Sequence, residues 1–129
     1  MRYLLDTHVW LWLQSDTARV PDSVRTRLAD PASTVLLSSV SSWEIAIKFA
    51  RGKLPLPEPP ATYVPTRMYR DAITALPVSH AHALHVATLP HHHSDPFDRL
   101  LIAQAQLEGI PLVTADRRIP RYDVEVLPA

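Results

Sequence analysis

The sequence lacks cysteine altogether and has only two glycines among its 129 residues. Without cysteine, the chain can have no disulfide framework, no thiolate zinc site and no cysteine nucleophile. Long apolar runs are also missing: the longest, residues 9–13, is far shorter than the ~20 residues that a membrane-spanning helix needs. The first residues lack the small-residue cleavage pattern of a signal peptide. We therefore expect a cytoplasmic protein with no membrane partner.

An excess of charge of one sign is missing as well. Thirteen Lys and Arg residues balance thirteen Asp and Glu residues, so the formal net charge is zero. This balance excludes the basic surface of a histone-like DNA packer and also an acidic disordered tail. The apolar fraction of 47% and the charged fraction of 20% are typical of folded domains. The length suits one hydrophobic core, so we expect residues 1–129 to form a single domain.

Proline, in contrast, is abundant, with thirteen residues. Four of them lie in the stretch Leu-Pro-Leu-Pro-Glu-Pro-Pro at residues 54–60. Each proline fixes its own φ angle and disfavours a helix at the residue before it. The chain on either side is too short for a core of its own, so we interpret this stretch as a stiff connector.

Short apolar runs alternate with helical patterns along the chain. We expect strands at residues 3–5, 34–38, 73–76, 112–114 and 124–126. Helices are expected near residues 9–13, 21–28, 63–71, 79–87 and 96–108, and another between a capping box at Ser41 and Glu44 and a stop at Gly52. The strands do not alternate polar and apolar residues, which is typical of a parallel sheet covered on both faces. The predicted fold class is therefore α/β.

Acidic residues stand where such a fold binds ligands. Asp6 and Asp116 each close a predicted strand, and ligands of open parallel sheets bind beyond the carboxyl ends of the strands. Taken singly, either residue is explained as well by a turn or a helix cap. Asp98 is harder to explain, because it shares a helix face with apolar residues, where a charge needs a partner or a metal.

Glu44 has a simple structural explanation, because it completes the predicted capping box and forms a solvated stripe of the helix with Lys48 and Arg51. Together with the three aspartates, however, it suggests one acidic pocket. Two carboxylates 4 Å apart repel each other by about 4 kcal/mol at an effective dielectric of 20. Four such charges need a cation or shared protons to be tolerated, and a ligand set of oxygens without thiolates favours Mg²⁺ or Mn²⁺ as the cation. Such a site suits hydrolysis of a phosphodiester.

Four segments together resemble the PIN-domain nucleases, and most of all the VapC group of toxins from bacterial type II toxin–antitoxin systems. They are Asp6-Thr7-His8, Ser42-Trp43-Glu44-Ile45, the run from Asp95 to Ala105, and Leu112-Val113-Thr114-Ala115-Asp116. The resemblance implies a three-layer α/β/α sandwich around a mostly parallel sheet. It also implies an endoribonuclease that uses Mg²⁺ or Mn²⁺, forms a homodimer and is inhibited by a VapB-type antitoxin. The resemblance gives the chain no sequence-specific DNA binding of its own.

The same resemblance assigns roles to individual residues. The metal ligands and catalytic residues would be Asp6, Glu44, Asp98 and Asp116, with Asp116 the least constant position in the family. Thr114 would support the site from behind, and Asp95 would lie close to it as the cap of the helix. Independently of the resemblance, Arg99, Arg117 and Arg118 adjoin the acidic segments and could bind phosphate groups, although plain surface charge explains each of them equally well. His8, next to Asp6, could contact the substrate.

Other residues allow more than one interpretation. The triplet His91, His92 and His93 could bind a metal, but a solvated loop is the better interpretation, since adjacent residues cannot all face one ion. Trp43 and Ile45 lie on two apolar faces of one predicted helix, which suggests burial against the sheet and against a second subunit. The alternatives for the function are a related nuclease without toxin biology and a non-catalytic binding module. Against the binding module, Asp6, Glu44 and Asp98 are all present.

Overall fold

The computed structural model describes residues 1–129. In chain order, the strands are β1 (Arg2–Leu5), β2 (Thr34–Ser38), β3 (Thr74–Leu76), β4 (Leu112–Thr114) and β5 (Val126–Pro128). The α-helices are α1 (Thr7–Ser15), α2 (Asp22–Ala29), α3 (Ser39–Ala50), α4 (Pro60–Arg70), α5 (His80–His85) and α6 (Pro96–Glu108). Three short 3₁₀ helices are η1 (Thr17–Arg19), η2 (Val86–Thr88) and η3 (Ile119–Arg121).

The strands form one sheet in the order β3-β2-β1-β4-β5. Each neighbouring pair is parallel, and the central strand β1 sets Leu4 beside Leu36 of β2 and beside Leu112 of β4. The parallel sheet predicted from the non-alternating apolar strands is confirmed.

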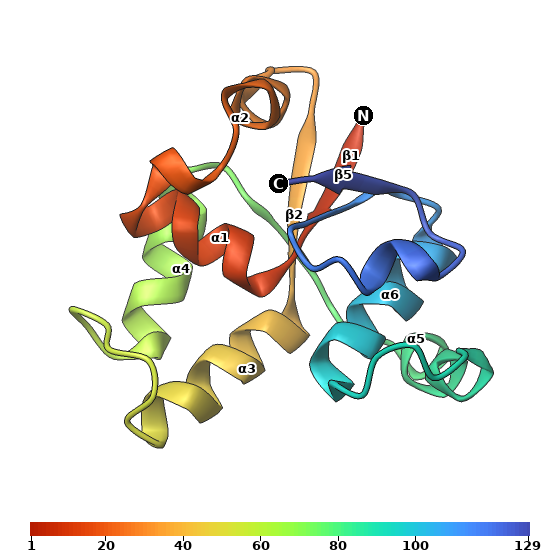
Figure 1. Ribbon diagram of the computed structural model, residues 1–129. Helices are drawn as coiled ribbons and strands as arrows, with labels where there is room; N and C mark the ends of the chain where they lie inside the picture. The colour runs from red at the N-terminus through yellow and green to blue at the C-terminus, as the bar shows by residue number, and fades with distance from the viewer.

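Helices cover both faces of this sheet. Side chains along a strand point alternately to opposite faces, so Leu4 packs into one core with Leu101 and Ile102 of α6. Its neighbour Leu5 packs into the other core, with Trp10 of α1. Figure 1 shows α5 and α6 on one side of the sheet and α1, α2 and α4 on the other. The three-layer α/β/α sandwich is confirmed.

The carboxyl ends of the three central strands meet the amino ends of helices at one edge of the sheet. Strand β1 runs through Asp6 into α1, and β2 runs directly into α3. Helix α3 packs against both α1 and α6 below the sheet in the view of Figure 1. Short connections at this edge therefore bring residues that are far apart in the sequence close together.

Helix α3 begins earlier than the sequence pattern predicts. Its N-cap is Ser38, whose Oγ accepts a hydrogen bond from the backbone N–H of Val40 at 3.0 Å. The predicted capping box at Ser41 and Glu44 is wrong, because β2 passes into the helix without a loop. Ser41 lies inside the helix instead, where its Oγ accepts a hydrogen bond from the Thr7 hydroxyl at 2.8 Å.

Two other boundaries differ from the prediction. The last strand spans Val126–Pro128, not residues 124–126, because Val126 pairs with Leu112 in the sheet. Helix α4 begins at Pro60 rather than near residue 63, with proline in the first turn, where its missing N–H is harmless. The rest of the proline-rich stretch, residues 54–59, belongs to the connection between α3 and α4, which contains no helix or strand. Helix α6 has the predicted bounds and ends at Gly109, whose φ is 65°.

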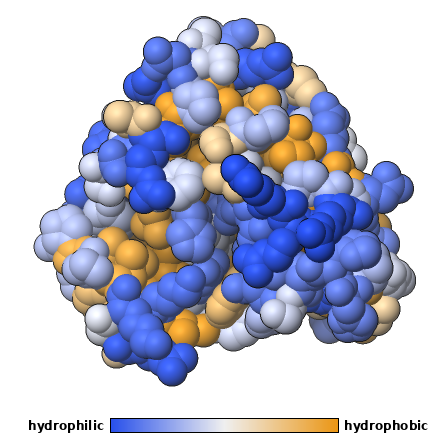
Figure 2. All heavy atoms as spheres, in the orientation of Figure 1, coloured by the Kyte–Doolittle hydropathy of each residue, from blue (hydrophilic) through white to orange (hydrophobic).

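The two apolar faces of α3 have different surroundings. Ile45 is fully buried in the core, whereas Trp43 is 59% exposed and packs edge to face on Phe97 of α6. In the same orientation as the ribbon, Figure 2 shows hydrophilic residues over much of the centre and right, and hydrophobic residues toward the lower left. None of the helices combines the length and the apolar character that crossing a membrane requires. Burial of the Trp43 face by a second subunit stays a prediction.

Candidate active site

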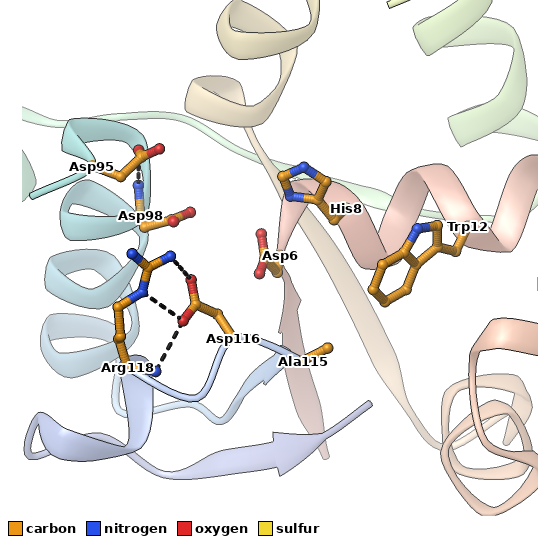
Figure 3. Close-up of a pocket in the computed structure, with 8 residues that line it drawn as sticks. All are labelled: Asp6, His8, Trp12, Asp95, Asp98, Ala115, Asp116 and Arg118. Carbon is orange, nitrogen blue, oxygen red and sulfur yellow. Dashed lines mark hydrogen bonds and ion pairs between the residues drawn. The ribbon is translucent and has the colours of Figure 1, made fainter. Parts of the chain in front are cut away.

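Three of the four predicted acidic residues line one cavity of about 410 Å³ at the carboxyl edge of the sheet. Asp6 follows β1, Asp98 lies in the first turn of α6, and Asp116 follows β4 by two residues. Figure 3 shows the side chains of Asp6 and Asp98 pointing toward each other, while Asp116 points toward Arg118. The other residues that line the cavity are His8, Trp12, Asp95, Ala115 and Arg118.

The fourth residue, Glu44, lies behind the cavity on α3. Its side chain is 2% exposed, so a solvated helix stripe is the wrong explanation for it. Its Oε2 pairs with the Lys48 ammonium, while its Oε1 is buried without a hydrogen-bond partner. Its negative charge helps to raise the pKa of both Asp6 and Asp98, so it belongs to the same electrostatic cluster.

Thr114 connects two of the carboxylate positions. Its hydroxyl donates to Asp6 Oδ2 at 2.6 Å and accepts the backbone N–H of Asp116 at 3.0 Å. Burial raises the pKa of Asp6, although the hydrogen bond from Thr114 opposes this effect. The second oxygen, Asp6 Oδ1, is buried without a partner. Thr114 thus lies where the sequence places it, directly behind Asp6.

Asp98 is the most strongly perturbed acid of the site. Burial and the negative charges around it raise its pKa to about 8. The acidic neighbours are Asp6, Asp95, Glu44 and Asp116. Asp95, at the N-cap of α6, accepts the backbone N–H groups of Phe97 and Asp98 at 2.8 and 3.1 Å, as the sequence predicts. A carboxyl group with a pKa this far from normal lies in a site crowded with negative charge.

Asp116 is perturbed in the opposite direction. Burial acts to raise its pKa, but hydrogen bonds from Arg118 and from His93 lower it to about 2. The Arg118 guanidinium contacts both carboxylate oxygens, at 3.1 and 3.0 Å, and its backbone N–H adds a third bond. Arg117 does not line the acidic cavity and faces a separate hollow beside β5. Of the two adjacent arginines that the sequence offers for phosphate contacts, Arg118 therefore lines the cavity and Arg117 does not.

Arg99 does not face the cavity, and the prediction that it contacts substrate is wrong. Its side chain enters the protein interior, and the residue is 8% exposed. Its guanidinium donates to four backbone carbonyls and to the Tyr122 hydroxyl, at 2.8–3.4 Å. The carbonyls belong to Val86, Leu89, Pro90 and His93. Arg99 therefore shapes the loop that precedes α6.

This role predicts a large stability change for Arg99→Met. The substitution keeps an unbranched apolar side chain but leaves buried carbonyl groups without donors, each of which is costly. We expect the free energy of unfolding, from urea denaturation followed by circular dichroism, to fall by about 2–4 kcal/mol. The matched control Arg117→Met, at an exposed position, should change it by less than about 0.5 kcal/mol. Equal effects of the two substitutions would contradict the assigned role.

The histidine triplet is not uniformly solvated. His91 and His92 are exposed, but the His93 side chain is buried. Its Nε2 lies 2.8 Å from Asp98 Oδ2 and 3.0 Å from Asp116 Oδ2. Interpreting the whole triplet as a solvated loop is therefore wrong for His93. Its position two residues before the capping Asp95 is the signal that distinguishes it from the other two.

The aromatic and imidazole side chains of α1 lie in two different environments. His8 and Trp12 lie on α1 and line the cavity, with ring centroids 6.5 Å apart. The Arg19 guanidinium stacks over the Trp12 ring at 4.3 Å from its centroid. Trp10, in contrast, is fully buried in the core. His8 thus lies where a contact to substrate is predicted, and Trp12 joins it at the cavity.

The donor set fits a hard divalent cation. The cluster offers carboxylate oxygens, which Mg²⁺ and Mn²⁺ prefer, and no thiolate. Two buried oxygens, Asp6 Oδ1 and Glu44 Oε1, have no hydrogen-bond partner in the chain. Buried charged atoms of this kind need a compensating partner. Ligand atoms of His93, Asp98 and Asp116 also lie within 4.8 Å of one another.

Comparison with known proteins identifies a family, a curated relative and solved structures of the same fold. The family model of the PIN domain matches residues 3–125. Over 64 residues, the chain is 48% identical to Ribonuclease VapC16 of Mycobacterium tuberculosis, an alignment that covers 50% of this chain and 45% of that protein. The chain therefore spans about half the length of this curated relative.

Two solved structures share the fold along the whole chain. VapBC2 from Rickettsia felis, bound to a DNA fragment from its promoter, has a TM-score of 0.75 at 18% identity and covers 100% of this chain and 99% of its own. DNA-bound VapBC from Salmonella typhimurium has a TM-score of 0.75 at 19% identity and covers 99% of this chain and 98% of its own. At such low identity, the likeness is one of fold.

Proposed function

The chain belongs to the PIN domain family, and on that premise we propose that it is a metal-dependent endoribonuclease, the toxin of a type II toxin–antitoxin pair. The observation that carries this proposal is the cluster of four carboxylates from separate segments, two of which have a buried oxygen without a partner. The relative named as a ribonuclease supports RNA as the substrate. Residues 1–129 would form one nuclease domain.

In this proposal, Asp6, Glu44, Asp98 and Asp116 hold Mg²⁺ or Mn²⁺. A bound ion of this kind polarises the phosphoryl oxygen and lowers the pKa of water. Asp6 and Asp98 face each other across the cavity and would supply the ligand atoms nearest to the substrate. Thr114 holds Asp6 Oδ2 and leaves Oδ1 free, so the carboxylate has one oxygen for support and one for the ion.

Substrate contacts in this proposal come from the rim of the cavity. His8 offers an imidazole next to Asp6, and the Trp12 ring offers a flat apolar face of the kind on which bases stack. Arg118 is the cation that a phosphate would meet there, although it is paired with Asp116 in the free protein. Arg117 lies farther round the surface and would contact a longer RNA.

The proposed partner is a VapB-type antitoxin. Its support is that the solved structures with this fold include VapBC complexes and a toxin–antitoxin complex from Klebsiella pneumoniae. A homodimer is also proposed, with the exposed Trp43 side of α3 as the apolar surface available to it. Cytoplasmic location follows from the proposed substrate, because cellular RNA is used there.

The experiment that tests the proposed function compares Asp6→Asn with Asp16→Asn. Asp16 is exposed and its side chain caps no backbone group, so the second variant controls for loss of a charge. Labelled RNA incubated with Mn²⁺ should be cut by the parent protein and by Asp16→Asn. Cleavage by Asp6→Asn should be slower by about 100-fold or more, because a substituted metal ligand loses several kcal/mol of transition-state stabilisation.

Two results would contradict the proposal. Cleavage that persists in EDTA, or that survives Asp6→Asn, would rule out the metal mechanism. A folded parent protein that cuts no RNA in any divalent ion would favour the non-catalytic binding module. Growth arrest on expression, relieved by the product of the neighbouring gene, would separate a toxin from a nuclease without toxin biology.

A further inference from the structure

His93 connects two carboxylates that come from different parts of the fold. Its Nε2 hydrogen bonds to Asp116 Oδ2 at 3.0 Å and lies 2.8 Å from Asp98 Oδ2. Asp98 belongs to α6, whereas Asp116 belongs to the segment after β4. The His93 side chain is only 2% exposed. A single ring nitrogen is thus enclosed between two acidic groups of the site.

The hydrogen bond at the other ring nitrogen, Nδ1, shows which nitrogen of His93 carries the proton. The backbone N–H of Asp95 donates to His93 Nδ1 at 3.2 Å, so Nδ1 is an acceptor and has no proton. In a neutral imidazole the proton must then lie on Nε2. His93 therefore presents an N–H group to the two carboxylates. A metal on Nε2 would require the proton on Nδ1, where it would point at the Asp95 N–H.

The loop that carries His93 is held from the opposite side. The Tyr122 hydroxyl accepts the backbone N–H groups of His92 and His93, at 3.1 and 2.9 Å. The Arg99 guanidinium donates to the carbonyl of Pro90 at 2.8 Å and to the Tyr122 hydroxyl. Both Tyr122 and Arg99 are buried. The imidazole is therefore fixed by its surroundings, as a group that orients others must be.

We propose that His93 is a positioning residue that, through its Nε2–H, holds Asp98 and Asp116 in the arrangement in which both can bind one divalent cation. This inference rests on the proposed metal-dependent function. The Nε2–H hydrogen bonds to Asp116 Oδ2, and Asp98 Oδ2 lies against the same nitrogen. Without the N–H between them, the two carboxyl groups would share no partner, and the ion would have to bring them together itself.

Two substitutions separate this role from simple packing. In His93→Gln, the side-chain amide nitrogen can occupy the position of the imidazole Nε2 and can still donate a hydrogen bond to the carboxylates. In His93→Asn, the shorter side chain reaches only the position of Nδ1. Its amide oxygen can still accept the Asp95 N–H, but no group donates to the carboxylates. The measurement is Mn²⁺ titration by calorimetry on the full chain without RNA, together with thermal unfolding in EDTA.

We expect His93→Asn to bind Mn²⁺ 10–100-fold more weakly than the parent protein, as is typical when an outer partner of a metal ligand is lost. His93→Gln should stay within about threefold of the parent. Saturating Mn²⁺ should largely restore RNA cleavage by His93→Asn, because the carboxylates themselves are intact.

Three results would overturn the inference. Parental Mn²⁺ affinity in His93→Asn would show that the donor is not needed. Equal loss of affinity in both variants would indicate a packing role or direct metal ligation by His93. A parent protein that binds no Mn²⁺ would remove the inference together with the metal site. The expected pattern of affinities in a protein that cuts no RNA would support the role of His93 while contradicting the proposed nuclease.

Discussion

Asp98→Asn should abolish RNA cleavage and, in the absence of divalent ions, stabilise the folded protein. Loss of a metal-binding carboxylate is expected to slow cleavage roughly 1,000-fold, since the Lewis acidity of an ion is worth several kcal/mol. The gain in stability follows from the pKa of Asp98, which burial and acidic neighbours raise to about 8. Above pH 8, Asp98 of the folded protein is ionised although it is partly buried and surrounded by other acidic groups.

The direction of the pH effect follows from the same pKa. The folded state binds the Asp98 proton more tightly than the unfolded state does, whose carboxyl has a pKa near 3.8. The stability that this proton supplies is complete below about pH 4 and is lost as the pH rises through 8. Asparagine is neutral at every pH and can still turn an oxygen toward His93. We expect the Asp98→Asn substitution to raise the free energy of unfolding at pH 8.5 by about 1–3 kcal/mol. The full pKa shift would give more, but water in the open cavity screens the carboxylate and reduces the effect.

Urea denaturation in EDTA at pH 5 and at pH 8.5 measures this gain, which should be larger at the higher pH. The control is again Asp16→Asn, which should show no comparable dependence on pH because Asp16 is exposed. Added Mg²⁺ should stabilise the parent protein but not Asp98→Asn, because only the parent binds the ion tightly. Destabilisation by Asp98→Asn at pH 8.5 in EDTA would contradict the unfavourable ionisation of Asp98.

The sequence predicted the layers of the fold because they depend on local patterns. Apolar strands separated by amphipathic helices specify a covered parallel sheet whatever the details of packing. Helix α6 was predicted with its observed bounds, since Pro96 at its first turn and Gly109 after its last residue are strong signals. The meeting of Asp6 with Thr114 also follows from topology, because β1 and β4 are neighbours that end at the same edge.

Residues whose role depends on distant partners escaped prediction. His93 contacts Asp116 across 23 positions of sequence, and its only local distinction from His92 is its place two residues before Asp95. Arg99 lies one residue after Asp98, but the helix turns its side chain into the interior and toward Tyr122. The start of α3 was misplaced because Ser38 and Ser41 are equally good caps. The two candidate caps differ in whether a loop follows β2. The helix begins directly after Ser38, which still pairs with Leu76 of β3.

The affinity for Mn²⁺ should rise about tenfold per pH unit between pH 6 and pH 8 and then level off. Below its pKa of about 8, Asp98 carries a proton that the ion must displace. Asp116 adds nothing to this slope, because Arg118 and His93 hold its pKa at about 2 and it is ionised throughout. The site thus combines one carboxylate that is ready for a cation with another that is ionised only as the cation arrives.

Calorimetry in two buffers of different ionisation enthalpy measures the protons released. We expect close to one per ion from Asp98 at pH 6.5, and any further release to come from Asp6, whose pKa burial also raises. Asp116→Asn is the matched control: it should weaken binding but keep most of the pH dependence, because it leaves the Asp98 proton in place. Asp98→Asn should weaken binding and flatten the dependence, because there is no longer a proton to displace. An affinity of the parent protein that is constant from pH 6 to pH 8 would mean that Asp98 is already ionised in the free site, and that the negative charge of the cluster is balanced within the chain.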